Sequence, residues 1–420
     1  SGKDLIQNHL TFAIYNHTAI WEGDESKWPR GFRTNGHLLL NGEKMSKSTG
    51  NFKTLKTAIE EYSADAMRFA LADAGDGIED ANFVHDTANA AILRFTKELE
   101  WIESIREASA QGKLRAADSS ATFADRVFAN AIDTAIARTK DHYENMMFRE
   151  ALKSGYYDLQ SARDAYRVQC DGDAGMRADL AARFIEVSTL LIAPFTPHTC
   201  EHVWGAILGR EGSVTKAGFP VGDAPDPSVA AAGKYLDDLV KTVRGGVAKA
   251  TAPPKKKPAV PPPPKVCDRV DFFVAEKFGG WQEVCLGILA DVYGADGTFP
   301  PVSDILEKVK ASPLAAQADF KNVMKMVMPF VKFKMNEAAV AGRDALGVRL
   351  IFDEAGVLRE NSEYVARVCG LKEVGVFAAD ADSTEKAAAV KGGVKVDQAT
   401  PGSPGVNFVV TELSVEGVTI

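Results

Sequence analysis

Two lysines, Lys44 and Lys47, stand three residues apart among small, hydroxyl-bearing and glycine residues in NGEKMSKSTGN, positions 41–51. A lysine ammonium is a compact charge with three hydrogen-bond donors, which suits the phosphates of a nucleotide. When pyrophosphate leaves an attacked α-phosphorus, negative charge grows on the departing group. A cation that approaches most closely in that state accelerates the step. Two lysines at this spacing on their own indicate a solvated hairpin tip more often than a loop that closes over a triphosphate.

The surrounding elements place this segment after a strand. Residues 37–40 are short and apolar, and Asn41-Gly42 is a strong tight-turn pair. Thr54 is a candidate N-cap, and residues 58–74 carry a helical apolar rhythm. Residues 2–17 read as a strand-to-helix turn followed by a helix. Together, these features predict the tail of an α/β domain over residues 1–52.

The rest of the chain divides by composition into three parts. From 82 to 245 the apolar period is helical, which predicts a helix bundle. Residues 246–266 form a basic linker, and seven of the fifteen residues from 251 to 265 are prolines, which favours extended polyproline II geometry. Residues 267–420 predict a small α+β domain.

Four segments support the α+β prediction. Residues 281–289 indicate a helix, and residues 320–335 indicate another that is broken at Pro329. Residues 348–352 and 405–410 read as strands around a helix that contains residues 364–369.

Composition bounds the class of protein. The chain has 420 residues, 45% of them hydrophobic and 25% charged, which is ordinary for a soluble globular protein of two or three domains. No apolar run is long enough to cross a bilayer. The net charge of −8 does not indicate a nucleic-acid binder, yet residues 241–265 hold seven cations and no acid. Five scattered cysteines without CxxC spacing indicate a reduced compartment: Cys170, Cys200, Cys267, Cys285 and Cys369.

The full string KMSKS, Lys44 to Ser48, is identical to the second signature of class I aminoacyl-tRNA synthetases. SGKDLIQNHL resembles the strand-end segment of the leucyl enzymes, and YSADAMRFALADA resembles the helical stem-contact segment that follows the lysine loop. LLIAPFTPHTCEHVW resembles a helix-bundle motif shared by the leucyl, isoleucyl and valyl enzymes, and VMKMVMPFVKFKM resembles the C-terminal region of the archaeal and eukaryotic cytosolic leucyl enzymes. The resemblance implies a mixed, mainly α protein. Its parts would be the C-terminal tail of a Rossmann-type α/β catalytic domain (1–52), a helical stem-contact segment (53–81), an anticodon-binding-like, tRNA-binding bundle (82–245), the linker and the α+β domain.

The same resemblance assigns roles to individual residues. Lys47 would stabilise the charge on the pyrophosphate side, with assistance from Lys44, while Met45 and Ser46 would offer backbone groups to the adenine side of ATP. Gly2 would allow close backbone approach to the adenosine. Asp4 would accept a hydrogen bond from a ribose hydroxyl. His9 would either lie near this pocket or only fill a gap on a helix face.

The implied activity is ATP-dependent activation of L-leucine and its transfer to tRNA(Leu) in the cytoplasm, with Mg²⁺ accompanying ATP. The histidine-pair signature, the editing domain and most of the leucine pocket are absent, so we expect a C-terminal portion that is inactive without its N-terminal half. Another synthetase (isoleucyl, valyl or methionyl) and a non-catalytic tRNA-binding or scaffold fragment are the alternatives. The sequence leaves membership of a larger assembly and the individual tRNA contacts open.

Two further signals carry alternatives. His198, Cys200 and His202 have side chains that ligate zinc, but no fourth ligand is evident, and packing in the bundle is the favoured interpretation. The basic linker would touch tRNA phosphates, dock a partner or act only as a solubilising spacer. Within the bundle we expect contacts to the shape and backbone of the tRNA and little reading of base edges.

Overall fold

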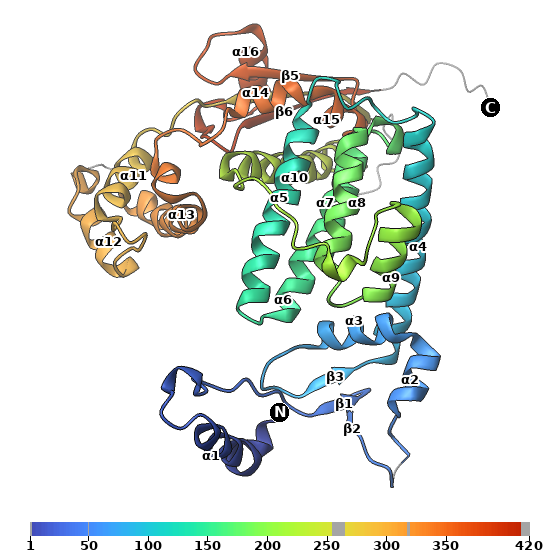
Figure 1. Ribbon diagram of the computed structural model, residues 1–420. Helices are drawn as coiled ribbons and strands as arrows, with labels where there is room; N and C mark the ends of the chain where they lie inside the picture. Colours follow the sequence, from blue (N-terminus) through green and yellow to red (C-terminus); the bar gives the residue numbers. More distant parts are fainter. Residues whose placement is uncertain (1, 49, 254–264, 317–319, 413–420) are drawn as a thin grey trace. The chain divides into compact units, whose positions relative to one another are not determined.

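The structure is a computed structural model that describes residues 2–48, 50–253, 265–316 and 320–412 (Figure 1). The chain divides into two compact units, Ser1–Pro225 and Asp226–Ile420. Each unit contains buried apolar clusters of its own. The predicted fold class is confirmed: the described residues are mainly helical, and among them each unit has one small sheet. Most of the proline-rich linker lies outside the described residues.

The first unit opens on a helical stretch. The order is η1 (Lys3–Leu5), η2 (Ile6–Leu10), α1 (Thr11–Ile20) and η3 (Glu25–Lys27). A helix was predicted here, but its first two turns are a 3₁₀ and a π turn, and regular α-helix begins only at Thr11.

A three-stranded sheet follows, with strand order β2-β1-β3. Strands β1 (Leu38–Leu40) and β2 (Glu43–Lys44) are antiparallel, and Asn41 (φ 49°) and Gly42 (φ 84°) form the two-residue turn that the sequence predicted. Strand β3 (Ala81–Phe83) lies parallel to β1. The sheet is therefore completed by residues that come after the two helices α2 and α3.

Helices α2 (Leu55–Tyr62) and α3 (Ala64–Ala74) replace the single helical rhythm read from the sequence. The predicted cap at Thr54 is confirmed, because its side chain accepts a hydrogen bond from the Thr57 amide. The break falls at Ser63, whose φ of 69° is left-handed. Its hydroxyl accepts a hydrogen bond from the amide of Ala66, so Ser63 ends one helix and caps the next.

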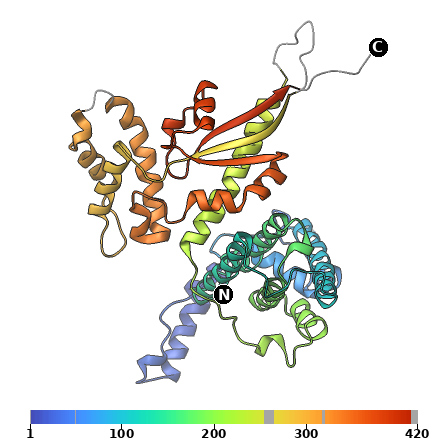
Figure 2. The same ribbon diagram turned by 90° about the horizontal axis from the view of Figure 1, so that it is seen from above.

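The predicted helix bundle is confirmed over the remainder of the first unit. Its helices lie side by side, as the view from above shows (Figure 2), and their buried side chains form two apolar clusters. Thr122 and Asp125 form a complete capping box at the start of the second of them. The segments are α4 (His85–Ala110), α5 (Phe123–Glu144), α6 (Phe148–Leu152), η4 (Lys153–Asp158), α7 (Leu159–Gln169), η5 (Asp173–Gly175), α8 (Ala178–Ile192), α9 (Pro197–Glu201), η6 (His202–Ile207) and η7 (Val214–Lys216).

The second unit begins with α10 (Pro227–Thr251), which packs against a second sheet of order β5-β4-β6. Its strands are β4 (Lys265–Val274), β5 (Glu373–Ala378) and β6 (Gly405–Glu412), with β4 parallel to β5 and antiparallel to β6. The other helical segments are α11 (Trp281–Val292), α12 (Val302–Lys310), η8 (Pro313–Ala316), α13 (Phe320–Ala341), η9 (Gly342–Leu346), α14 (Glu354–Glu360), α15 (Ser362–Cys369), α16 (Thr384–Lys391) and η10 (Val396–Gln398).

Three details of this unit differ from the sequence-based expectation. Helix α13 continues through Pro329 without ending. Residues 348–352 form no strand: the Val348 carbonyl accepts a hydrogen bond from the amide of Phe278, and Phe352 packs against Tyr235. Helix α10, placed in the bundle by its apolar rhythm, buries that rhythm on β4, β6, α14 and α15 instead. The predicted domain boundaries at 52 and 81 stay predictions, and the two compact units divide at Pro225 and Asp226, before α10 and not at 245.

Candidate active site

The segment KMSKS leaves the sheet through β2 and forms a closed hairpin. Lys44 is the last residue of β2 and lies opposite Leu39 of β1. Met45 is partly buried and packs on the apolar cluster that contains Leu40 and Phe83. Because Met45 points into the core, the backbone on either side of it is held close to the sheet while both lysine side chains face solvent.

Backbone hydrogen bonds close the turn that carries Lys47. The Ser46 amide donates to the carbonyl of Asn51 at 2.9 Å, and the Ser46 and Ser48 hydroxyls lie 2.8 Å apart. The Gly50 amide donates to the carbonyl of Lys47 at 3.4 Å, with Gly50 at φ 76°. A residue with a side chain rarely adopts this left-handed conformation, which accounts for a glycine after the signature.

Neither predicted catalytic cation is neutralised within the described part of the chain. Lys44 and Lys47 are exposed, and neither forms an ion pair with a described residue. By contrast, Lys53, a few residues further on, pairs with Glu61. An ammonium without a carboxylate partner is available to an external anion.

The predicted adenosine-side residues lie at the start of the chain. Gly2 pairs with Asn35 through an isolated parallel bridge, in which the Lys3 amide donates to the Asn35 carbonyl at 2.9 Å. The Asp4 carboxylate lies 2.8 Å from Nε2 of His37, the residue directly before β1. Residues 37–39 therefore connect the two parts of the site: His37 contacts Asp4, and Leu39 pairs with Lys44.

His9 is not part of this arrangement. It is exposed in η2, where its backbone amide donates to the Asn8 side chain at 2.5 Å. No hydrogen bond or ion pair connects it to Asp4 or the lysine hairpin within the described ranges. Its predicted role beside ATP stays a prediction.

Asp80, which the sequence analysis did not identify, forms hydrogen bonds to Lys3 and His37, the two residues next to Asp4 in the chain and in space. Its Oδ1 accepts hydrogen bonds from Nζ of Lys3 at 2.8 Å and from the backbone amide of His37, also at 2.8 Å. The hydrogen bond from Lys3 is the largest cause that holds the pKa of Asp80 below its usual value, and the His37 amide adds to it. Asn82, two residues on, accepts a hydrogen bond from the Gly42 amide at 2.7 Å. Two polar residues with i and i+2 spacing, Asp80 directly before β3 and Asn82 within it, were the available sequence signal.

The alternative metal ligands in the bundle do not come together: in the described part of the chain, no group of three or more His, Cys, Asp or Glu is arranged to hold an ion. The three candidates in the bundle have separate surroundings. His198 lies 3.0 Å from Asp65, His202 is exposed, and Cys200 is buried beside Thr196. Burial raises the pKa of the Cys200 thiol to about 12.

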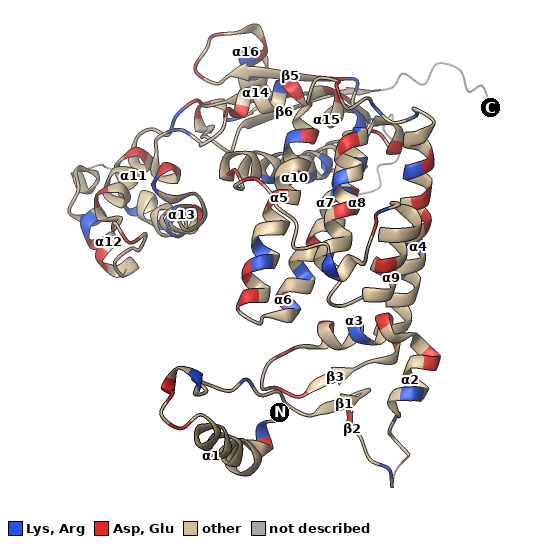
Figure 3. Cartoon of the chain, viewed as in Figure 1, with Lys and Arg blue, Asp and Glu red and all other residues tan. Residues whose placement is uncertain are grey.

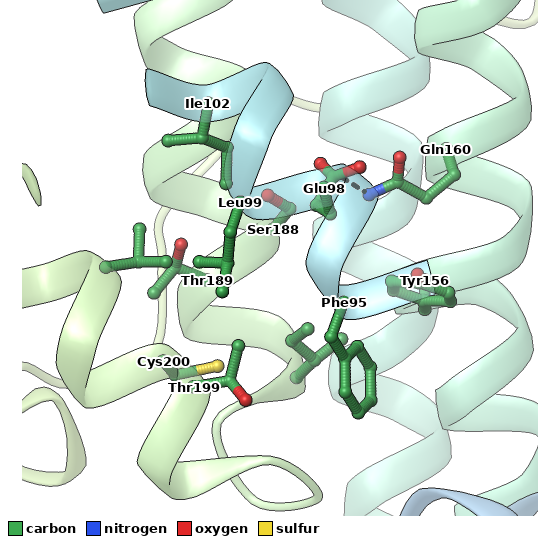
Figure 4. A pocket seen from close by; sticks show the side chains of 12 residues that line it. Phe95, Glu98, Leu99, Ile102, Tyr156, Gln160, Ser188, Thr189, Thr199 and Cys200 are labelled. Atoms are coloured by element: carbon green, nitrogen blue, oxygen red, sulfur yellow. Dashed lines mark hydrogen bonds between the residues drawn. The ribbon is translucent and has the colours of Figure 1, made fainter. Parts of the chain in front are cut away.

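Neither of two hollows in the structure is lined by residues of the lysine hairpin. The first, of about 30 Å³ inside the bundle, is lined by Gln160, whose Nε2 donates to Glu98 (Figure 4). The Oε1 atom of Gln160 is buried without a hydrogen-bond partner among the described residues. This hollow has room for water and not for a nucleotide. The second, of about 740 Å³, belongs to the second unit and is lined by aromatic residues that include Tyr235, Phe278 and Phe333.

Three ranges of the chain match models of known protein families, and all three families belong to tRNA ligases. Residues 1–96 match the family model "tRNA synthetases class I (M)", and residues 125–260 match "Anticodon-binding domain of tRNA ligase". Residues 274–351 match "Leucine--tRNA ligase, RagD-binding domain". The class is therefore that of the class I tRNA synthetases.

Individual relatives narrow the class. The chain is 45% identical to a cytoplasmic leucine--tRNA ligase of Arabidopsis thaliana over 98% of its own length and 38% of the relative's. It is 42% identical to that of Pongo abelii over 91% of the chain, and 36% identical to that of Saccharomyces cerevisiae over 97%. The chain belongs to the leucine--tRNA ligase family. It spans between about a third and two fifths of the length of these relatives. No described helix is both long and apolar enough to cross a membrane.

Proposed function

We propose that the protein to which this chain belongs joins L-leucine to tRNA(Leu) at the expense of ATP, in the cytoplasm, where the relatives' names place them. The observation that carries the proposal is the KMSKS hairpin. Met45 anchors it on the core, while the ammonium groups of Lys44 and Lys47 face solvent and form no ion pair with described residues.

In this proposal the two halves of the candidate site contact different parts of ATP. Asp4 accepts a ribose hydroxyl, Gly2 lets the backbone approach the adenosine, and the backbone of Met45 and Ser46 faces the adenine side. Lys47, assisted by Lys44, stabilises the charge that develops on the leaving pyrophosphate. Mg²⁺ enters with ATP, whose phosphates are its expected ligands.

The surface of the first helical stretch supports a larger catalytic domain. Phe12, Tyr15 and Ile20 are 64%, 70% and 73% exposed, although each is a large apolar or aromatic residue. Burying such side chains is favourable by about 1.5–3 kcal/mol each. We propose that further parts of the enzyme, including the leucine pocket, cover this face.

The bundle is proposed to bind the body of the tRNA. In the view of Figure 3, Lys and Arg alternate with Asp and Glu along α4, α5, α7 and α8, and no broad face of one sign is visible. Many ion pairs within the bundle join these charges, for example Arg163 with Glu98 and Arg183 with Asp133. Binding would therefore use shape and scattered backbone contacts.

A protein-binding role is a second candidate for the second unit. It is favoured by the match of residues 274–351 to a model named for binding RagD. On α13, which lies within that match, Met326, Met328 and Phe333 are 49%, 45% and 56% exposed. Exposed large apolar side chains gathered on one helix are typical of interaction surfaces. Binding of the chain to purified RagD, compared with a variant in which these three residues are serine, tests this candidate.

The synthetase proposal is tested by amino-acid-dependent exchange of pyrophosphate into ATP, using the complete natural protein that contains these residues. Leucine should support exchange far better than isoleucine, valine or methionine, and tRNA(Leu) should then be charged with leucine. Exchange supported best by methionine or another amino acid would replace leucine as the substrate. Binding of tRNA(Leu) without any exchange would favour a non-catalytic role.

A further inference from the structure

We propose that Asp80 and Asn82 are positioning residues for the ATP site. Asp80 would hold the segment that bears Asp4, and Asn82 would hold the hairpin that leads to Lys44 and Lys47. Both residues belong to the short segment 79–85 around β3, and neither is assigned to contact ATP. The inference rests on the proposed function.

The segment that carries Asp4 needs an external support. Asp4 lies in η1, a three-residue 3₁₀ turn without a side-chain cap, and none of the residues of η1 is buried. Its own side chain is 66% exposed. Burial does not fix such a residue, and it lies in the first turn of the helical stretch that continues through η2 and α1, where helices fray.

Asp80 supplies that support through the residues on either side of Asp4 in space. One carboxylate oxygen accepts from Nζ of Lys3, the residue directly before Asp4 in the chain. The same oxygen accepts from the amide of His37, whose ring nitrogen Nε2 contacts Asp4 at 2.8 Å. Asp80 thus contacts the side chain of the residue before Asp4 and holds the backbone of His37, whose imidazole contacts the Asp4 carboxylate.

The fit between the two segments is close at Gly36. A Cβ at this position would lie 2.2 Å from the carbonyl oxygen of Glu79 and 2.7 Å from Oδ1 of Asp80, nearer than real contacts allow. The Gly36 amide also donates to the Gly77 carbonyl at 3.4 Å. The loop before β3 and the residues before β1 are therefore packed backbone against backbone, which leaves little freedom for His37.

Asn82, Phe83 and His85 form hydrogen bonds to the turn at Asn41 and Gly42, which leads into the lysine hairpin. The Asn82 side chain accepts from the amide of Gly42 at 2.7 Å, in the turn between β1 and β2. The Asn41 amide donates to the Phe83 carbonyl at 2.9 Å, and the Asn41 side chain accepts from the amide of His85 at 3.1 Å. These bonds orient the turn from which Lys44 and KMSKS continue.

The two residues are expected to affect different kinetic constants. A ribose acceptor that is set loose weakens binding of ATP in its ground state. A displaced lysine hairpin loses contacts that are made in the transition state. Supporting residues of this kind typically contribute about 10- to 100-fold.

The test measures leucine-dependent pyrophosphate exchange in the complete natural protein, with rates expressed per active site determined by titration. Asp80→Ala should raise KM for ATP about tenfold and leave KM for leucine unchanged. Asp80→Asn should lie between wild type and Asp80→Ala, because it keeps an acceptor for His37 and loses the charge that pairs with Lys3. The matched control is Glu79→Gln. Glu79 directly precedes Asp80 in the chain, its side chain is exposed, and the substitution removes an equal charge.

Asn82→Ala should lower kcat for exchange about tenfold with KM for ATP nearly unchanged, and Asn82→Asp, which keeps the accepting oxygen, should restore most of the rate. Asp80 variants whose KM for ATP matches that of Glu79→Gln would overturn the inference, even where their melting temperature falls. Lys47→Ala, measured alongside, separates the two levels of argument. The proposed function is contradicted if the wild type shows no exchange or if Lys47→Ala exchanges at the full rate. If Lys47→Ala is impaired while the Asp80 and Asn82 variants behave as wild type, only the positioning roles are contradicted.

Discussion

Oδ2 of Asp65 lies 2.6 Å from the backbone amide of Thr199, so a buried carboxylate of α3 caps α9 in the bundle. Asp65 also accepts from the Thr199 hydroxyl at 2.7 Å, and its Oδ1 lies 3.0 Å from Nδ1 of His198. Arg68, one turn later in α3, donates from Nε to the Phe195 carbonyl at 3.1 Å. The helix pair that follows the KMSKS hairpin is thereby fixed to the bundle.

The first prediction concerns this junction. Asp65→Ala leaves several partly buried donors without their acceptor and should lower the free energy of unfolding by about 3 kcal/mol. Thr199→Val removes only one donor and should cost about 1 kcal/mol. Denaturant titration of both variants measures the difference. Equal stability of Asp65→Ala and wild type would show that the junction does not stabilise the unit.

A second prediction uses two adjacent glycines of α10. A Cβ on Gly246 would lie 2.0 Å from Cζ of Phe408 in β6, whereas a Cβ on Gly245 meets nothing within 4 Å. Gly246→Ala should therefore destabilise the protein by about 1–3 kcal/mol through overpacking. Gly245→Ala should stabilise it by roughly 0.5–1 kcal/mol, since alanine is the better helix former.

Thermal and denaturant unfolding of the two variants provide the measurement. Combining Gly246→Ala with Phe408→Leu should recover part of the loss, because the two positions are in contact. Two glycine variants that change stability in the same direction would contradict the close approach of α10 to β6.

The third prediction concerns acid stability. Burial raises the pKa of Asp125, but hydrogen bonds from Arg115, Tyr166 and the Thr122 amide outweigh burial and hold the pKa below its ordinary value. A carboxyl group with a depressed pKa in the folded state contributes stability that is present above the unfolded pKa of about 3.9 and is lost as the pH falls towards the folded value.

Wild type should therefore lose free energy of unfolding below about pH 4, and Asp125→Asn should lose less over the same range, although it is less stable at neutral pH. Asp118→Asn, at an exposed position nearby, is the control and should follow wild type. Parallel pH profiles for Asp125→Asn and wild type would exclude Asp125 as a cause of acid destabilisation.

A fourth prediction concerns thiol reactivity. Burial raises the pKa of Cys200 to about 12 and that of Cys285 to about 11. At pH 8, only about one Cys200 thiol in ten thousand is then ionised, and the thiolate is the reactive form. Ellman's reagent should label both residues slowly in the native protein and rapidly in denaturant. Fast native labelling of Cys200, located by peptide mapping, would contradict its burial in the bundle.

Residue types and spacing predicted the parts of the fold that depend on local rules. Asn41-Gly42 gave the turn and Thr54 the helix cap, because each is a local backbone preference. The end of a helix at Ser63 and the continuation through Pro329 were not predicted, because packing on neighbouring elements decides such positions. The apolar face of α10 was visible in the sequence, but the surface that covers it was not, since periodicity shows a buried face without showing its partner.

The same division holds for the candidate site. The lysine hairpin was found because its chemistry is written in consecutive residues. Asp80 lies 43 positions from His37 and 77 from Lys3. Contacts between such distant residues depend on the pairing of β1 with β3, which no short motif specifies.

The measurement that tests the central claim most directly is the exchange rate of Lys47→Ala beside Lys56→Ala in the complete natural protein. Lys56 is an 86% exposed lysine on α2 that is paired only weakly with Glu60, and its loss should leave exchange unchanged. Lys47→Ala should lower leucine-dependent exchange by about 10²–10³-fold with a smaller change in KM for ATP. Equal rates for the two variants would contradict a catalytic role for the KMSKS hairpin.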